Sequence, residues 1–293
     1  MLLGDGDGFV RCACGHRHWG RYGAAGLLLT DPERGVLLQR RAWWTHHGGT
    51  WALPGGAIRS DENPAQAATR EAEEEAAIDP GAVLVTATST EEHGTWRYTT
   101  VLATVGAEVQ PKEVSKETAE LRWVTPEDVS SLRLHRDFAA AWPRLREQLE
   151  RRLVLVVDGA NVVGSRPDGW WRDRAAAAAR LRDRLGALVH SDVCGSDVPV
   201  PDAPDWCWRP RVLLVVEGRA VATEPHADVE VLAAPSDGDS AIVDATRTAR
   251  TTRPQDHVVV VTADRELRAR VREEGAGVLG PATLLHLLDG QCR

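Results

Sequence analysis

The chain has 293 residues, of which 43% are hydrophobic and 27% charged, and this balance excludes a largely disordered protein. At about 150 residues per domain, the length predicts two domains. The formal charge is −8, with 18 basic and 22 acidic residues in the first 152 and 17 and 21 in the rest, so neither half is a basic arm that would clamp nucleic acid. There is no long apolar stretch and no apolar signal region, so we expect a cytoplasmic protein that does not enter a membrane.

The five cysteines are an odd number without a secretory signal, and we therefore expect reduced thiols. Cys12 and Cys14, with His16 and His18, are residue types that bind zinc. On an extended chain, however, their alternating spacing directs neighbouring ligands to opposite sides. Zinc ligands usually occur as C-x2–4-C with a second pair. We therefore do not expect a zinc site here.

Residues 1–21 are expected to form an N-terminal extension. The patterns in the rest of the first half predict strands and helices in mixed order. Apolar runs at 22–30 and 36–40 flank a proline–glycine turn and predict a β-hairpin. Asn63 and Pro64 predict the start of a helix that runs to residue 76. Strands at 83–88, 96–105 and 121–124 and helices at 126–133 and 138–151 are expected to follow.

Three glutamates of the predicted helix at 63–76 have the spacing i, i+3 and i+4, which places Glu71, Glu74 and Glu75 on one face. Like charges at that spacing destabilise a helix by a few tenths of a kcal/mol per pair. A Mg²⁺ ion would compensate, because this cation is bound by carboxylate oxygens together with substrate phosphates. Arg70 can orient Glu74. The alternative is a solvated acidic helix in a glutamate-rich protein.

The residues around this helix resemble the signature of the Nudix hydrolase family, in which MutT-like enzymes belong. The matching residues are Leu53-Pro54-Gly55-Gly56, then Glu62, then Arg70-Glu71-Ala72-x-Glu74-Glu75-x-Ala77-Ile78. The resemblance implies an α+β fold, with a mixed β-sheet between helices, over residues 22–150. It also implies hydrolysis of the diphosphate of a nucleoside diphosphate derivative or a nucleoside triphosphate, with Mg²⁺ or Mn²⁺.

The resemblance also assigns roles by position. Glu71, Glu74 and Glu75 would bind the metal and form the catalytic group; Gly55, Gly56 and Arg70 would contact the substrate, and Glu62 would support the loop. A further glutamate on a later loop, Glu117 or else Glu120, would act as ligand or base, and Glu117 fits the spacing better. The family usually has glycine where this chain has Ala77. If Ala77 adopts a left-handed conformation, we expect a cost of about 1 kcal/mol.

Aromatic and histidine residues flank this region, and an exposed aromatic could stack on a nucleobase. The alternative is that most of them are packing residues. They are Trp43, Trp44, His46, His47, Trp51, Trp96 and Tyr98.

The second half, residues 153–293, alternates apolar strands with helices, which predicts an α/β domain with a parallel, doubly wound sheet. The strands are expected at 153–158, 212–216, 229–233 and 258–261, and the helices near 172–185, 239–250, 264–274 and 281–288. The stretch 190–210 is rich in proline and aspartate and lacks periodicity, so we expect a long loop there.

Aspartates follow three of these strands: Asp158, Asp239 and Asp264. Ligands of open α/β sheets bind beyond the carboxyl ends of the strands, so the three carboxylates could share a Mg²⁺ or Mn²⁺ ion. The alternative is that Asp239 and Asp264 merely cap helices.

The second half resembles the NYN domain family, which is related to PIN nucleases. The matching residues are VVDGANVVGS at 156–165, DSAI at 239–242 and TADREL at 262–267. The resemblance implies a metal site at Asp158, Asp239 and Asp264, a turn role for Asn161, and binding or cleavage of single-stranded RNA. We find no clear match to the additional acid that many PIN nucleases have. Arginines between 172 and 184 could follow an RNA backbone or form a solvated helix face.

Together these patterns predict a two-domain protein with a Nudix hydrolase and a metal-dependent RNA-binding or ribonuclease domain. The alternative from another class is a sensor, in which the first domain binds a nucleotide without turnover and regulates the second. A third possibility is that the second domain is a plain RNA-binding or scaffolding module. No pattern in the sequence sets an oligomeric state.

Overall fold

The computed structural model describes residues 4–106, 108–166, 169–201, 203–234 and 237–290. Two compact units make up the chain: an N-terminal unit, Met1–Leu149, and a C-terminal unit, Glu150–Arg293. In the described part of the chain, every helix is too short or too polar to cross a bilayer.

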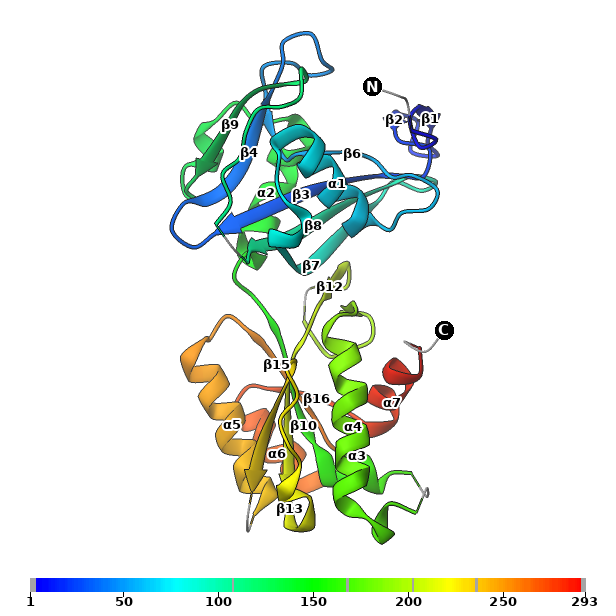
Figure 1. The fold of residues 1–293 in the computed structure, drawn as a ribbon, viewed down its shortest axis with the longest axis vertical. Helices are drawn as coiled ribbons and strands as arrows, with labels where there is room; N and C mark the ends of the chain where they lie inside the picture. The colour runs from blue at the N-terminus through cyan, green and yellow to red at the C-terminus, as the bar shows by residue number, and fades with distance from the viewer. Residues whose placement is uncertain (1–3, 107, 167–168, 202, 235–236, 291–293) are drawn as a thin grey trace. The chain divides into compact units, whose positions relative to one another are not determined.

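The N-terminal unit is built on a mixed β-sheet (Figure 1). Its central pair, β3 and β8, is parallel, and the other pairs are antiparallel. In sheet order the strands are β7 (Val83–Glu92), β8 (Arg97–Val105), β3 (Ala24–Asp31), β4 (Gly35–Arg41) and β5 (Trp51–Ala52), while β6 (Gly55–Ala57) pairs with β3 and β9 (Thr118–Val124) with β4. The expected hairpin at 22–40 forms as β3 and β4.

Helix α1 (Pro64–Ala76) lies across one face of this sheet (Figure 1). Asn63 caps it by accepting a hydrogen bond from the Gln66 N–H, and Gln66 reciprocates with its side chain. Its alanine face, including Ala68 and Ala72, packs against sheet residues such as Leu27. Small side chains on that face allow the helix to approach the strands closely.

The opposite face of the sheet is also covered, because alternate residues such as Leu28 and Leu38 are buried as well. Helix α2 (Arg136–Gln148) contributes buried Phe138 and Trp142. The helix expected at 126–133 is wrong: the structure has only the 3₁₀ turn η2 (Val129–Ser131), since this short polar segment lacks an apolar face. A second 3₁₀ turn, η1 (Pro80–Ala82), follows α1.

The N-terminal extension contains an antiparallel hairpin of two short strands, β1 (Phe9–Arg11) and β2 (Arg17–Trp19). Sequence patterns did not predict these strands, because three residues are too few to show a period.

The C-terminal unit is an all-parallel, five-stranded sheet, and its four expected strands are all present. The order is β14 (Val229–Ala234), β13 (Arg211–Glu217), β10 (Leu153–Asp158), β15 (His257–Val261) and β16 (Gly277–Leu279). The central strand β10 is buried at every position. This is the pattern expected for a parallel sheet covered on both faces.

Helices cover both faces of the parallel sheet, α5 and α6 on one and α3, α4 and α7 on the other (Figure 1). They are α3 (Gly159–Gly164), α4 (Arg174–Val189), α5 (Gly238–Thr252), α6 (Arg265–Glu273) and α7 (Pro281–Gly290), with 3₁₀ turns η3 (Trp170–Arg172) and η4 (Gly218–Ala222). Helix α3 stands where a tight turn was expected.

The stretch 190–210 is not a plain loop. It contains the antiparallel strands β11 (Val193–Cys194) and β12 (Trp206–Trp208), and their register places Cys194 opposite Cys207. The two cysteines form a disulfide. The expectation of reduced thiols is therefore wrong for this pair. The many prolines and aspartates of this stretch favoured the prediction of a loop. Two short strands form nevertheless, and the buried side chains of Trp206 and Trp208 stabilise them.

Candidate functional site

The two glycines of strand β6 lie against the part of α1 that carries the glutamates. Gly55 and Gly56 pair with Gly26 and Ala25 of β3. A Cβ atom at Gly56 would lie 2.5 Å from Oε1 of Glu71, so only glycine allows the Glu71 carboxylate to contact the backbone there. The two glycines therefore shape the surface on which the carboxylates of α1 rest.

Arg70 ties the loop before α1 to the helix itself. Its guanidinium donates to both carboxylate oxygens of Glu62, at 2.6 and 3.0 Å, and to the Ala57 carbonyl at 3.0 Å. Nη1 also donates to Oε1 of Glu71 at 2.7 Å and lies 3.5 Å from Oε1 of Glu74. A planar, multidentate cation suits this task because its donors point in fixed directions. Arg70 and Glu62 thus hold the loop and orient two of the three glutamates.

Glu75 is the most buried of the three glutamates. Its Oε2 accepts hydrogen bonds from the Gly55 N–H and from Nε2 of Gln39, both at 2.9 Å. Burial, together with the nearby charge of Glu71, raises the pKa of Glu75 to about 8, although the hydrogen bonds from Gly55 and Gln39 oppose the shift. Gln39 in turn accepts a hydrogen bond from the Thr118 hydroxyl at 2.8 Å. Gln39 was missed in the sequence because its contact spans 36 residues.

Glu71 and Glu74 complete the acidic face of α1. Burial raises the pKa of Glu71, and the Glu74 charge adds to that shift while Arg70 opposes it. Glu74 is more open and also pairs with Arg59 at 3.3 Å. Within the described ranges, the three glutamates do not bring three ligand atoms within 4.8 Å of one another.

The donor set fits a hard divalent cation. All three side chains offer carboxylate oxygens, which Mg²⁺ and Mn²⁺ prefer. Burial raises the pKa of both Glu71 and Glu75, and a neighbouring carboxylate adds to each shift: Glu74 for Glu71, and Glu71 for Glu75. A dication would favour their charged forms.

The later loop carries the two further glutamates that the sequence singled out. Glu120, on β9, pairs with Arg40 at 3.0 Å and with Arg122. Glu117 is exposed immediately before β9, next to the Thr118 that contacts Gln39. Of the two, Glu117 is therefore the one whose carboxylate has no described arginine partner. It is also adjacent to Thr118, which is linked to Glu75 through the side chain of Gln39.

The flanking aromatics divide into packing and exposed residues. Trp51 is buried, and Trp96 stacks on His18 with ring centres 4.2 Å apart and donates to the Gly20 carbonyl at 3.0 Å. Trp43 and Trp44, in contrast, are 82% and 58% exposed. Of the tryptophans in this set, these two are available to stack on a base; His46 and His47 are exposed as well, and Tyr98 is half-buried.

In the C-terminal unit, the three aspartates named from the sequence line one cavity of about 480 Å³. Asp158 is buried at the end of β10, where its carboxylate accepts from the Asn161 N–H at 3.0 Å and the Thr262 hydroxyl at 2.9 Å. Asn161 accepts from the Ala263 N–H at 2.9 Å, which joins the first turn to the end of β15. Burial raises the pKa of Asp158, and the charges of Asp239 and Glu217 act in the same direction.

The capping alternative holds for Asp264 but not for Asp239. Asp264 accepts from the Leu267 N–H at 2.8 Å and begins α6. Helix α5 is capped by Asp237, whose carboxylate accepts from the Ser240 N–H at 3.1 Å. Asp239 instead lies in the first turn and lines the cavity, where burial, followed by the charges of Asp264 and Asp237, raises its pKa.

Glu217 is a fourth acid of this cavity that sequence reasoning missed. It ends β13, the neighbour of β10, and a Cβ atom at Gly238 would lie 2.5 Å from its Oε2. The sequence does show an acidic residue at the end of an apolar strand. It does not show that this strand lies next to β10, which is what brings Glu217 to the cavity that Asp158 lines.

Two of the four arginines of α4 pair with acids, and a third lies over an aromatic ring. Arg182 pairs with Asp183 at 2.6 Å, and Arg184 pairs with Asp289 at 2.6 Å. Arg174 lies over the Trp170 ring at 5.2 Å. These contacts favour a solvated helix face over a track for an RNA backbone.

Comparison with known proteins agrees with the N-terminal site. The NUDIX domain model matches residues 20–148. A Mycobacterium tuberculosis protein named "Putative 8-oxo-dGTP diphosphatase 3" is 50% identical over 156 residues, which cover 50% of this chain and 71% of that protein. A nucleoside triphosphate pyrophosphatase/Nudix hydrolase fusion protein of Bifidobacterium longum is 44% identical over 153 residues, covering 50% of this chain and 32% of the fusion.

Among solved structures, the Nudix hydrolase RenU of M. smegmatis is 47% identical and covers 48% of this chain and 94% of that structure, with a TM-score of 0.45. The resemblance of the N-terminal half to Nudix hydrolases is thereby confirmed by the family model and the sequence relatives. The chain belongs to the Nudix family of hydrolases, which act on diphosphate bonds.

Proposed function

We propose that the N-terminal unit hydrolyses the diphosphate of a nucleoside triphosphate, or of a nucleoside diphosphate derivative, with Mg²⁺ or Mn²⁺. The observation that carries this proposal is the placement of buried Glu75 and partly buried Glu71 against the Gly55–Gly56 backbone of β6, with Arg70 bracing Glu71. Buried like charges destabilise a protein unless a cation compensates them.

In the proposed mechanism, Glu71, Glu74 and Glu75 would hold the ion. A bound divalent ion neutralises phosphate charge and activates water. Arg70 and Glu62 fix the loop so that the Gly55–Gly56 backbone faces the diphosphate, and Gln39 keeps the Glu75 carboxylate in place. Glu117, exposed beside β9, would accept the proton of the attacking water.

The substrate class follows from the relatives. The M. tuberculosis protein is named for 8-oxo-dGTP, and the B. longum fusion for nucleoside triphosphates. We propose an oxidised or unmodified purine nucleoside triphosphate as the first substrate to test. The exposed indoles of Trp43 and Trp44 are suited to stack on such a base.

A phosphate-release screen with Mg²⁺ tests this function across nucleoside triphosphates, 8-oxo-dGTP, nucleotide sugars, ADP-ribose and dinucleoside polyphosphates. With the best substrate, Glu74→Gln and Glu75→Gln should each lower kcat by about 100-fold or more, because a metal ligand acts mainly in the transition state. Glu73→Gln is the matched control, since Glu73 is exposed on the same helix, and it should retain wild-type turnover. Wild-type rates in both variants would exclude these glutamates as ligands.

The alternative is a sensor that binds a nucleotide without turnover. It predicts saturable nucleotide binding with no product in the same screen. Two features of the acidic face favour hydrolysis: all three glutamates are kept, and Arg70 and Gln39 orient them, which a sensor does not require.

We propose as a second function that the C-terminal unit is an NYN-type, PIN-like domain that binds a divalent ion and cleaves single-stranded RNA. The observation in its favour is the convergence of Asp158, Glu217, Asp239 and Asp264 on one cavity at the carboxyl ends of parallel strands. Cleavage of a labelled single-stranded RNA with Mn²⁺, lost in Asp158→Asn and kept in Glu75→Gln, would support it. RNA that stays intact with the wild-type protein would argue against nuclease activity.

A further inference from the structure

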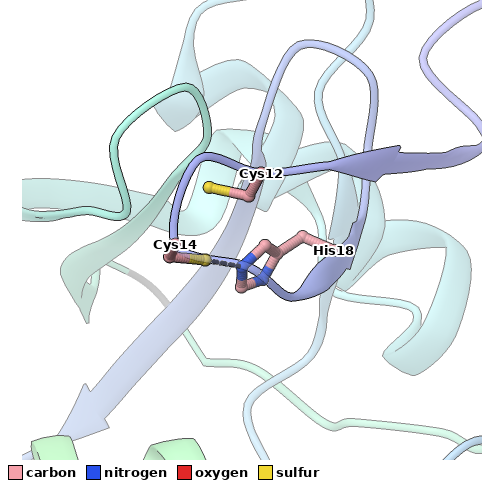
Figure 2. Close-up of side chains that lie close together, drawn as sticks. All are labelled: Cys12, Cys14 and His18. Atoms are coloured by element: carbon pink, nitrogen blue, oxygen red, sulfur yellow. Dashed lines mark hydrogen bonds between the residues drawn. The ribbon is translucent and has the colours of Figure 1, made fainter.

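A cluster of sulfur and nitrogen ligands lies on the N-terminal hairpin, on residues that the Nudix signature does not include. The ligand atoms of Cys12, Cys14 and His18 all lie within 4.8 Å of one another (Figure 2). Sγ of Cys14 is 3.2 Å from Nε2 of His18. Ligand atoms around a tetrahedral zinc ion are roughly 3.5 Å apart, so this pair already has the spacing of two zinc ligands.

The expectation that alternating residues would diverge is wrong here, because the chain between them is not extended. The Cys12 N–H donates to the His16 carbonyl at 2.9 Å, and the Gly15 N–H donates to the Cys12 carbonyl at 3.0 Å. Gly15 has a φ of +87°, which closes the turn in a conformation that favours glycine. The tight turn brings both sulfurs and the ring of His18 together.

Surrounding contacts hold two of the three side chains, Cys12 and His18, in place. Cys12 is buried, and its thiol contacts the His93 carbonyl. The His18 ring is stacked on Trp96, with the planes 11° apart. The His93 carbonyl and the Trp96 ring thus act as the kind of second layer of contacts that orients metal ligands.

We infer that Cys12, Cys14 and His18 bind a zinc ion. Two thiolates and an imidazole are soft and borderline donors that select zinc, in contrast to the carboxylates of α1, which suit Mg²⁺. The fourth position would fall to water or, after a rotation of its side chain, to the imidazole of His93, whose ring centre is 5.0 Å from that of His18 but which is not part of the 4.8 Å cluster. Binding releases the thiol protons to solvent.

Zinc would stabilise a segment that is otherwise weakly supported. The strands β1 and β2 have three residues each, and Phe9 and Trp19 are largely exposed. Two-stranded hairpins of this size are marginal in water and commonly depend on a metal or a disulfide.

The same segment reaches the loop that precedes α1. The Ser60 N–H donates to the Asp5 carboxylate at 3.2 Å, and the Ser60 hydroxyl also donates to it. Gly6 packs on the Ile58 carbonyl so closely that a Cβ atom would lie 2.1 Å from it. A zinc ion on the hairpin would therefore also steady the loop that carries Glu62.

Metal content of the untagged, reduced, full-length protein tests the inference. After zinc loading and dialysis, plasma mass spectrometry should find one zinc per wild-type chain, and a loss of that zinc in Cys14→Ser and His18→Ala. These two side chains are exposed or half-buried, so their replacement should leave the fold intact. His16→Ala and Cys292→Ser are matched controls that should retain zinc, and Glu75→Gln should retain it too, which separates this site from the hydrolase site.

The absorption spectrum of bound Co²⁺ distinguishes the cysteine-containing site from a cluster of three histidines. Among the described residues, His46, His47 and His135 also bring three ligand atoms within 4.8 Å. Co²⁺ bound by thiolates gives a strong charge-transfer absorption that imidazoles alone do not give. Wild-type protein should show that absorption, and Cys12→Ser and Cys14→Ser should lack it. Zinc retained by both Cys14→Ser and His18→Ala, or cobalt bound without the thiolate absorption, would overturn the inference.

Discussion

Arg70 and Glu62 form a two-point ion pair that joins the loop before α1 to the helix. Nε lies 2.6 Å from Oε1 and Nη2 lies 3.0 Å from Oε2, and the two side chains are only 16% and 13% exposed. The remaining Nη1 contacts Glu71. A single guanidinium therefore couples the position of the loop to the position of a proposed metal ligand.

Replacing Arg70 by Lys should uncouple loop and helix while keeping the charge. A lysine cannot make the two-point contact, and loss of a residue that orients a ligand typically lowers activity about 10- to 100-fold. We expect that loss mainly in kcat, with the free energy of unfolding lower by about 1–3 kcal/mol. Steady-state kinetics and urea unfolding measure both. Arg122→Lys, at an exposed pair on β9, is the control; equal kinetics in the two variants would contradict the role of Arg70.

The buried carboxylate of Glu75 predicts a pH dependence without metal. Its pKa, about 8 in the folded protein, is above the ordinary 4.5 because of burial, so the folded state keeps a proton that the unfolded state releases. The stability from this group is fully present below about pH 4.5 and is lost as the pH rises through about 8. In EDTA, the Tm of wild type should fall relative to that of Glu75→Gln between pH 5 and 9. A constant difference in Tm across this range would mean that the pKa of Glu75 is not raised.

Ala77 adopts the left-handed conformation that the Nudix signature usually gives to glycine. Its φ is 53° and its ψ 37°, and its N–H donates to the Glu73 carbonyl at 3.0 Å as α1 ends. The left-handed region costs an alanine about 1–2 kcal/mol; the greater chain entropy of unfolded glycine offsets about 0.4–1 kcal/mol of that. Ala77→Gly should therefore raise the free energy of unfolding by up to about 1 kcal/mol.

Ala76→Gly is the matched control for this substitution. It sits one residue earlier, in right-handed helix, and should lower the free energy of unfolding by about 1 kcal/mol through helix propensity alone, and by more because Ala76 is buried. Urea unfolding of both variants checks the pair. Opposite signs support the assigned backbone conformation, and destabilisation by both substitutions would contradict it.

Local patterns were sufficient where the candidate residues are close together in the sequence. The spacing of Glu71, Glu74 and Glu75 predicted one helix face, and the apolar runs predicted four of the five parallel strands. The fifth, Gly277–Leu279, is three residues long and begins with glycine, so no period marks it. The family model confirms the Nudix fold of the first half.

The features that the sequence did not predict depend on pairing between strands that are far apart in the chain. Gln39 reaches Glu75 because β4 pairs with β5, which ends just before Gly55, and Glu217 reaches the aspartate cavity because β13 neighbours β10. The disulfide between Cys194 and Cys207 depends on the register of two short strands. Each of these requires the tertiary fold, which composition and spacing do not specify.

The carboxylate cavity of the C-terminal unit predicts stabilisation by Mn²⁺. Burial raises the pKa values of Asp158 and Asp239, and the neighbouring carboxylates add to both shifts. A bound dication would relieve that repulsion and stabilise the folded state by mass action. In full-length protein carrying Glu74→Gln and Glu75→Gln, which weakens the first site, the Tm should still rise with Mn²⁺. Asp158→Asn should abolish most of that rise.

The two aspartates at the start of α5 provide the control, because they differ in role and not in charge. Asp237 caps the helix, so Asp237→Asn should lose at most about 1 kcal/mol of stability, since asparagine also caps well, and should keep the Mn²⁺ response. Asp239 lines the cavity without capping, so Asp239→Asn should lose the Mn²⁺ response and keep its stability in EDTA. Differential scanning fluorimetry with and without Mn²⁺ measures the Tm of the parent protein and of its Asp158→Asn, Asp237→Asn and Asp239→Asn variants. If Asp239→Asn keeps the Mn²⁺ response as Asp237→Asn does, Asp239 does not bind the ion and the cavity is not a metal site.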